Sequence, residues 1–174
     1  MLSLKHTFLP ILDELFATPG GSSSGGSSSG MNSGKFLAEA MRENLLEVQA
    51  CNLAIEKATH EEVKIFCQKM IDEHSRIGRL IEELAGKKQI QLPDGLTAKQ
   101  KAELEKLSQF SGDEFDRRFA GFNVRETEHE IRHYEEQTQQ GTDPEIKAYA
   151  ERVVKMLSRE LERAKKLEQA LQAA

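Results

Sequence analysis

The sequence predicts an all-α fold: a four-helix up-and-down bundle with one short extra helix and a docked amphipathic peptide helix. Three observations support this prediction. Apolar residues recur every three to four positions along most of the chain, which is the spacing of a helix with one buried face. Ala, Leu, Glu, Lys and Gln dominate the composition and favour helices, whereas proline, which breaks them, occurs only 4 times in 174 residues. No stretch shows the alternating pattern of a half-buried strand.

Residues 1–19 predict a short amphipathic helix. Its apolar stripe consists of Leu4, Phe8, Ile11, Leu12, Leu15 and Phe16. Thr7 suits the N-cap, and Pro10 falls in the first turn, where its missing N–H loses no hydrogen bond. A helix of about 12 residues is only marginally stable alone in water, so these large side chains need a partner surface. We therefore interpret the segment as a peptide that docks into a groove of a helical protein. The alternatives are a solubility or expression tag and a native N-terminal helix whose following loop was replaced.

Residues 20–30 consist only of glycine and serine, in the near-repeat GGSSSGGSSSG. Such a run has no apolar surface to bury and behaves as a flexible coil. Its regularity indicates an engineered linker, and Met31 directly after it resembles the start of a second reading frame. The hypothesis is a chimeric fusion of a partner peptide at 1–19, a linker at 20–30 and a four-helix bundle domain at 31–174.

Two long helices are predicted at the start of this domain, over about residues 33–58 and 60–86. Asn32 or the serine after it suits the N-cap of the first helix. Thr59 and Glu62 have the spacing of a capping box, which predicts the start of the second helix. Because almost no residues separate these two helices, we expect them to pack as antiparallel neighbours.

The second half of the domain predicts one short helix and two long ones. Thr97 and Gln100 form a capping box that begins a short helix ending near residue 110. A long helix follows over about residues 111–140. Asp143 then caps the last helix, with Pro144 at its first position. Because only about three residues connect the last two helices, these are also expected to be antiparallel neighbours.

Glu47 and His74 are polar residues on the apolar stripes of the first two helices. Counted from the turn at Thr59, they lie at similar heights, within about one helical turn of each other. We expect a buried polar cluster of Glu47, His74 and Thr127, with Asn44 beside it. A metal site or a proton-transfer site is the alternative at the same place.

Two Glu-x-x-His spacings occur in the fourth predicted helix, at Glu126 to His129 and at Glu130 to His133. Di-metal carboxylate bundles use this spacing on two different helices, but here both copies lie on one helix. These four residues mostly fall off the apolar stripe. We therefore expect a charged face that is exposed to solvent.

Several function classes lack their sequence features. A net charge of −5 without a basic stripe argues against nucleic-acid binding, and no apolar run approaches the length of a membrane span. No phosphate loop or nucleophile motif is present, so we expect neither an enzyme nor a cofactor. Cys51 and Cys67 lack metal-type spacing and are expected in the core, as in a reducing compartment. Asp13 and Glu14 interrupt any secretory signal, which predicts a cytoplasmic location, or a periplasmic one if a native signal peptide was removed.

Several stretches match a known bacterial family. They are Phe36-Leu37, Glu47-Val48, Val63-Lys64-x-Phe66, Met70-Ile71-Asp72-Glu73-His74-Ser75, Phe115-Asp116 and Asp143-Pro144-x-Ile146-Lys147. Over roughly residues 34–170, the sequence resembles the ferritin-like domain-of-unknown-function family whose members are often labelled as outer membrane proteins. The resemblance implies a ferritin-like four-helix bundle, and many members are exported and suspected of metal binding. Members usually carry further histidines where this sequence has Thr127 and Glu160.

The leading functional prediction is a non-enzymatic helical-bundle binding module. It would accept an amphipathic helix of a partner protein, represented by residues 1–19, in a groove between long helices. The alternative is a ferritin-like metal-binding protein with a redox or storage role. In that case Glu47, His74 and Glu160 would be the ligands.

Overall fold

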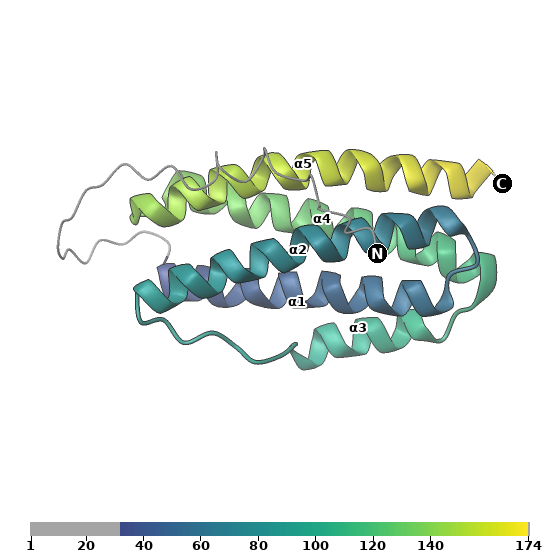
Figure 1. The fold of residues 1–174 in the computed structure, drawn as a ribbon, viewed down its shortest axis with the longest axis horizontal. Coiled ribbons are helices and arrows are strands. Elements are labelled where there is room, and N and C mark those ends of the chain that lie inside the picture. The colour runs from purple at the N-terminus through teal and green to yellow at the C-terminus, as the bar shows by residue number, and fades with distance from the viewer. Residues whose placement is uncertain (1–31, 174) are drawn as a thin grey trace, which may run out of the picture.

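The computed structural model describes residues 32–173, which form five helices (Figure 1). The helices are α1 (Ser33–Lys57), α2 (Glu61–Lys87), α3 (Ala98–Ser108), α4 (Gly112–Gln140) and α5 (Pro144–Ala173). The prediction of an all-α fold with four long helices and one short helix is confirmed. The predicted peptide helix and the Gly/Ser stretch lie outside the described residues.

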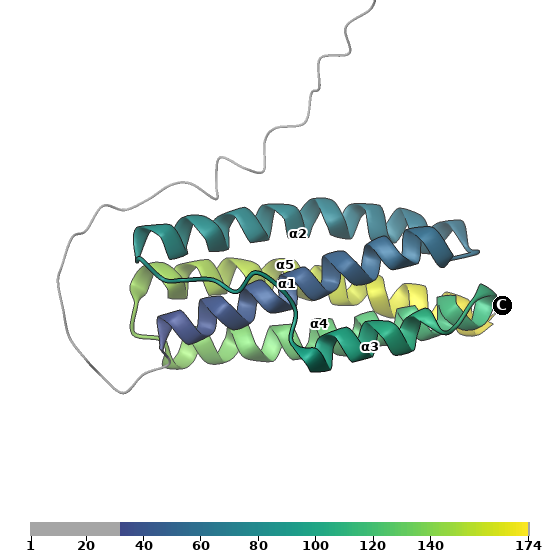
Figure 2. The same cartoon turned by 90° about the horizontal axis from the view of Figure 1, so that it is seen from below.

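The four long helices form a bundle of two antiparallel pairs. Helix α1 packs along α2, and α4 packs along α5, as expected from the short connections within each pair. The two pairs meet mainly through α1 and α4, while α2 and α5 meet on the other side. Helix α3 lies against the outside of α1 and α4 (Figure 2).

The connection between α2 and α4 runs back along the bundle instead of joining adjacent ends. The segment 88–97 and then α3 return the chain to the end where α2 begins, so α4 runs in the same direction as α2 (Figures 1 and 2). The prediction of a strictly up-and-down bundle is therefore wrong at this connection. An extended residue spans about 3.3 Å and a helical one about 1.5 Å, so this connection is long enough to cross the bundle. Four-helix bundles with one long crossover are a known topology.

Three of the predicted helix caps are confirmed. The Asn32 side chain accepts hydrogen bonds from two backbone N–H groups in the first turn of α1. Thr97 and Gln100 form the reciprocal bonds of a capping box at α3. Asp143 Oδ1 accepts from two backbone N–H groups at the start of α5. These caps depend only on residues within the first turn, which is why local spacing was sufficient to predict them.

The predicted capping box at the start of α2 is wrong. His60 occupies the N-cap position, and its side chain makes no capping hydrogen bond. The Thr59 hydroxyl instead donates to Asp116 Oδ2, at 2.7 Å. An acceptor from α4, which is distant in the sequence, thus replaces the local partner.

A belt of buried polar residues divides the apolar core at mid-height. One apolar cluster lies toward the α1–α2 connection and contains Phe115 and Phe119, and the other lies toward the opposite end and contains Phe36 and Leu157. Between them lie the residues that we call the polar belt: Asn44, Glu47, His74, Asn123, Thr127, Glu130 and Glu160. All four long helices contribute to it.

Two smaller predictions concern the cysteines and the membrane. Cys51 and Cys67 are buried free thiols in the first apolar cluster, as expected of core residues. None of the helices in the described part of the chain is long and apolar enough to cross a membrane. The cytoplasmic location stays a prediction.

Candidate metal centre and polar belt

The structure buries all three residues of the predicted polar cluster. Glu47 and His74 are each 1% exposed, and Thr127 is fully buried. His74 pairs with Glu160: the His74 Nε2 atom lies 3.3 Å from Glu160 Oε2. Its other ring nitrogen, Nδ1, lies 3.2 Å from the side-chain oxygen of Asn44. The imidazole therefore links α1, α2 and α5 through side-chain contacts.

Glu47 has a different partner, because it faces α4. Asn123 Nδ2 donates to Glu47 Oε2 at 2.8 Å, and Thr127 Oγ1 donates to Glu160 Oε1 at 3.2 Å. The second oxygen of Glu47 and the amide oxygen of Asn123 have no hydrogen-bond partner among the described residues. Glu47, His74 and Glu160, the ligand set of the predicted alternative, are thus buried near one another. Their ligand atoms, however, do not all lie within 4.8 Å of one another, a spacing that another group of residues has.

Burial and like charge raise the pKa of two carboxyl groups in the belt. Burial, followed by the charge of Glu160, raises the pKa of Glu47 well above its ordinary value. Burial, followed by the charges of Glu47 and Glu43, does the same to the pKa of Glu130. Both effects disfavour the charged form, so these two side chains hold their protons more tightly than exposed glutamates do.

The charged face predicted for the fourth helix is only partly exposed. His129 is exposed, but Glu130 is only 3% exposed and the His133 side chain only 15%. The prediction is wrong for Glu130 and His133 because α4 packs against α5 on one side and against α1 on another. A helix with two neighbours buries a wider arc than its apolar stripe indicates. Both imidazoles face Glu43, a buried α1 residue that the sequence analysis did not single out.

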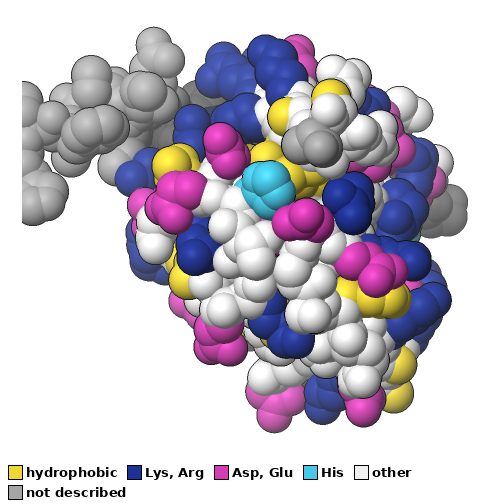
Figure 3. Space-filling view, turned by 90° about the vertical axis from the view of Figure 1, so that its right-hand side faces the viewer, with side chains coloured by type: hydrophobic (Ala, Val, Ile, Leu, Met, Phe, Trp, Pro, Cys, Tyr) yellow, Lys and Arg dark blue, Asp and Glu magenta, His cyan; other side chains and the backbone are white. Residues whose placement is uncertain are grey.

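A different cluster has the spacing of a metal site. It consists of His60, just before α2, and of Asp113 and Asp116 near the start of α4. One ligand atom from each residue lies within 4.8 Å of the other two, and His60 Nε2 is 3.5 Å from Asp113 Oδ1. Figure 3 views this end of the molecule and shows a histidine side chain at the surface with acidic side chains beside it.

Asp116 anchors this cluster and is fully buried. Its Oδ2 atom accepts three hydrogen bonds: from the backbone N–H of Thr59 at 3.0 Å, from the Thr59 hydroxyl at 2.7 Å and from the backbone N–H of His60 at 2.8 Å. Its Oδ1 atom is buried and has no hydrogen-bond partner in the described chain. Oδ2 therefore holds the backbone of His60 in place.

A lysine fixes the position of α4 relative to this turn. The Lys57 ammonium donates to the backbone carbonyls of Ser108, the last residue of α3, and of Phe110, in the connection to α4. The end of α1 is thereby tied to the start of the helix that carries both aspartates. Pre-positioning of ligands by such surrounding bonds is typical of metal sites.

Sequence reasoning missed His60, Asp113 and Asp116 as a group. His60 and Asp116 lie in different halves of the chain, and only the crossover connection brings the start of α4 to the α1–α2 turn. The available signal was Asp116 itself, an acidic residue next to Phe115 on an apolar stripe.

A known family matches most of the chain. The family described as "Domain of unknown function (DUF4142)" matches residues 19–167. That range includes the Gly/Ser stretch, so it gives no support for the predicted fusion. Its description assigns no outer-membrane location. A search of curated proteins gives no match.

Solved structures with low sequence identity share the fold. A DUF305 fragment from Deinococcus radiodurans is 13% identical, with a TM-score of 0.69, over 81% of this chain and 95% of that one. A DUF305 protein from Streptomyces coelicolor is 12% identical, with a TM-score of 0.68, over 80% and 92% of the two chains. CopM in its Cu(I)-bound form is 16% identical, with a TM-score of 0.68, over 80% and 96% of the two chains. At these identities the similarity shows the fold alone.

Proposed function

This chain belongs to the DUF4142 family, and we propose that it binds a divalent transition-metal ion through His60, Asp113 and Asp116. The observation that carries the proposal is the convergence of one imidazole and two carboxylates, whose ligand atoms lie within 4.8 Å of one another. The unpartnered, buried Oδ1 of Asp116 is the second support, since a buried oxygen without a partner is costly unless a ligand satisfies it.

The donor set favours a borderline metal ion. Imidazole nitrogen suits zinc, copper, iron and nickel, and Cu(II) binds most tightly among the divalent first-row ions. Two ligand atoms at bond lengths of about 2.0–2.2 Å from a tetrahedral ion lie about 3.4 Å apart, close to the 3.5 Å between His60 and Asp113. The fold similarity to CopM, which has Cu(I)-bound and Cu(II)-bound forms, also supports copper.

His60 and Asp113 leave the site open to solvent. Their side chains are 32% and 66% exposed, while Asp116 is buried beneath them. Three protein ligands leave at least one coordination position for water or another small ligand. The geometry is therefore suited to reversible uptake of an ion from solution.

Removing the exposed ligands should weaken metal binding without unfolding the protein. We expect His60→Ala and Asp113→Asn each to raise the Kd for Cu(II) at least about tenfold, because each removes one of three protein ligands. Isothermal titration of the full chain with Cu(II) measures this. Glu114→Gln is the matched control, since Glu114 lies in the same turn of α4 and its one ion pair within residues 32–173 is with Arg118, at 3.2 Å. An unchanged Kd in both ligand variants would remove the proposal.

Partner binding is a second proposal, in which the amphipathic segment around Phe8 and Phe16 occupies a groove between α3 and α4. The groove has a volume of about 660 Å³. Its apolar lining comes from Leu107, Phe110 and Phe122, and its polar lining from four cationic and three acidic side chains. The cationic surplus complements the aspartate and glutamate of the segment.

Charged substitutions in the segment test this second proposal on the full chain. If the segment docks, Phe8→Asp combined with Phe16→Asp should lower the Tm by about 4 °C or more, because large buried anchors dominate such contacts. Ser22→Asp combined with Ser27→Asp is the control, since it adds the same charge without removing an anchor. Equal melting temperatures for the two double variants would contradict docking.

A further inference from the structure

Cys51 of α1 and Cys67 of α2 are thiols that the proposed metal site does not use. Both are fully buried, and both belong to the same apolar cluster. Neither forms a disulfide in the structure. They come from the two helices of one antiparallel pair, so their relative position follows from the register between α1 and α2.

The contact between Asn44 and His74 fixes this register. Asn44 Oδ1 of α1 lies 3.2 Å from His74 Nδ1 of α2. Cys51 lies seven residues after Asn44 on α1. Cys67 lies seven residues before His74 on α2. Seven residues make almost two complete turns, so each cysteine projects from nearly the same face as the polar residue on its own helix. Because the helices are antiparallel, both steps lead to the same height in the bundle, and the two cysteines face each other.

The same step in the opposite direction gives another buried pair. Leu37 lies seven residues before Asn44 on α1. Ile81 lies seven residues after His74 on α2. Both side chains are fully buried in the other apolar cluster. Burial repeated at seven-residue steps on both helices is the pattern of helices that pack along their length. The two cysteines are therefore one of three facing pairs with a common register.

The two thiol groups also interact directly. A hydrogen bond with Cys67, followed by burial, raises the pKa of Cys51 well above its ordinary value. Three alanines of α1, at 50, 54 and 58, are buried in the same cluster. Their side chains have little volume, which favours close approach of α1 to its neighbours. Close approach matters here because a disulfide needs Cβ atoms about 3.5–4.5 Å apart.

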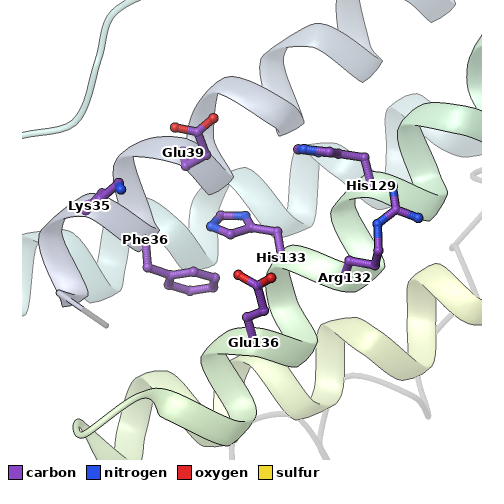
Figure 4. Close-up of a pocket in the computed structure, with 7 residues that line it drawn as sticks. All are labelled: Lys35, Phe36, Glu39, His129, Arg132, His133 and Glu136. Carbon is purple, nitrogen blue, oxygen red and sulfur yellow. The ribbon is translucent and has the colours of Figure 1, made fainter. Parts of the chain in front are cut away.

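Burial limits how an oxidant reaches these thiols. The cavity of about 400 Å³ between α1 and α4 has no cysteine among its lining residues (Figure 4). It lies beside Lys35 and Phe36 near the start of α1, whereas Cys51 lies nearer the end of that helix. Oxidation therefore needs a local opening of the bundle and a small oxidant. Hydrogen peroxide is such an oxidant, because it is only slightly larger than a water molecule.

We propose that Cys51 and Cys67 are a modification site, at which hydrogen peroxide joins α1 to α2 through a reversible disulfide. In the first step, one cysteine thiolate attacks the O–O bond, becomes a sulfenic acid and releases hydroxide. In the second step, the other thiolate attacks the sulfenic sulfur, forms the S–S bond and releases a second hydroxide. The protons of the two thiols convert both hydroxides to water.

The atoms and electrons of this reaction balance. Two thiols and one hydrogen peroxide give one disulfide and two water molecules. The two sulfurs lose two electrons in total, and the peroxide oxygens gain them. Because Cys51 holds its proton tightly and only the thiolate reacts, the bond forms more slowly than one between exposed thiols.

Peptide mass mapping of the full chain after peroxide treatment tests the site. Remaining thiols are alkylated before digestion, which prevents exchange between peptides. Trypsin cleaves after Lys57 and Lys64, so the two cysteines fall in different peptides. After peroxide treatment we expect these two peptides as one joined species from the monomeric chain, which dithiothreitol separates. Treated protein without this species, or with it only in cross-linked dimers of the chain, would overturn the proposal.

Thermal melting tests whether the bond forms in the folded protein. A disulfide that closes a loop of about 15 residues restricts the unfolded chain, so oxidised wild type should melt about 4 °C or more above its reduced form. Cys51→Ala, treated in the same way, is the control, because it keeps every methionine but lacks one thiol. Cys67→Ala serves the same purpose if Cys51→Ala does not fold. An equal change in Tm on oxidation in wild type and control would contradict a cross-link between folded helices.

Discussion

Replacing Asp116 by alanine should lower the free energy of unfolding by about 3 kcal/mol or more. Its Oδ2 atom accepts three hydrogen bonds, from Thr59 and His60, in a fully buried position. Hydrogen bonds to a charged group contribute about 1.5–3 kcal/mol each, and buried donors left without a partner add a desolvation penalty. The contributions are not additive, so we expect a total well below their sum.

The loss should act through the α1–α2 connection. Asp116 Oδ2 accepts from the backbone N–H groups of Thr59 and of His60, the N-cap residue of α2, so its removal leaves both donors without this acceptor. Urea unfolding followed by circular dichroism measures the effect as a lower midpoint with an unchanged slope. Asp113→Ala is the control, since its side chain is 66% exposed and we expect a change below about 1 kcal/mol. A loss below 1 kcal/mol in Asp116→Ala would show that the turn does not depend on this carboxylate.

Replacing Glu47 by glutamine should stabilise the protein at neutral and alkaline pH. The carboxyl is 1% exposed, and burial raises its pKa well above 4.5. The groups that face it are acidic or uncharged at neutral pH: Glu160 of α5, Glu126, Glu130 and Asn123 of α4, and Cys67 of α2. No cation compensates its charge in the described chain. Replacing buried charged groups by uncharged ones of similar volume is often neutral or stabilising by about 1–4 kcal/mol, as measured for buried ion pairs, and for the single Glu47 carboxyl we expect about 1–2 kcal/mol at pH 8.

The pH dependence of stability distinguishes removal of a buried charge from better packing as the cause of the stabilisation. Because the pKa of Glu47 is higher in the folded chain than in the unfolded one, the folded state binds the proton more tightly. The resulting stabilisation is complete below pH 4.5 and is lost as the pH rises through the pKa of the folded state. Wild type should therefore lose more stability than Glu47→Gln between pH 5 and pH 8.

Thermal melting at several pH values measures this difference. Glu62→Gln is the control, because Glu62 is exposed in the first turn of α2 and should leave the pH dependence of wild type unchanged. Parallel pH profiles for wild type and Glu47→Gln would contradict the prediction. Such a constant difference between the two proteins would indicate improved packing.

The buried histidine could be predicted from the sequence, but its partner could not. His74 continues an apolar stripe, and its spacing alone indicates a polar residue in the core. The sequence placed Glu47 in the same polar cluster because the two residues lie at similar heights above the same turn. In the structure, Glu160 of α5 is closer to the imidazole, while Glu47 turns toward Asn123. Height along a helix follows from residue counts, but the direction of a side chain depends on how the helices are rotated in the bundle.

Contacts between distant segments also explain two wrong predictions: the exposed face of α4 and the capping box at the start of α2. Glu130 and His133 were predicted to face solvent because they lie outside the apolar stripe of α4. In the structure, two neighbouring helices cover α4. The sequence predicts Thr59 as the cap of α2 because Glu62 lies three residues after it. In the structure His60 is the N-cap, and a carboxylate from α4 accepts from the Thr59 backbone N–H, the group that the glutamate of a capping box would bind. In both cases a contact between distant segments overrides a local preference.

The sequence alone determined the helices, most of their caps and the presence of polar residues in the core. These features depend on side chains within one or two helical turns, and their spacing along the chain is therefore sufficient. The tertiary structure alone decided which polar groups meet, including the cluster of His60, Asp113 and Asp116 and the pairing of Glu43 with two histidines. Those groups come from helices brought together by the crossover and by the rotation of each helix. Both are set by the packing of the whole bundle rather than by any local segment.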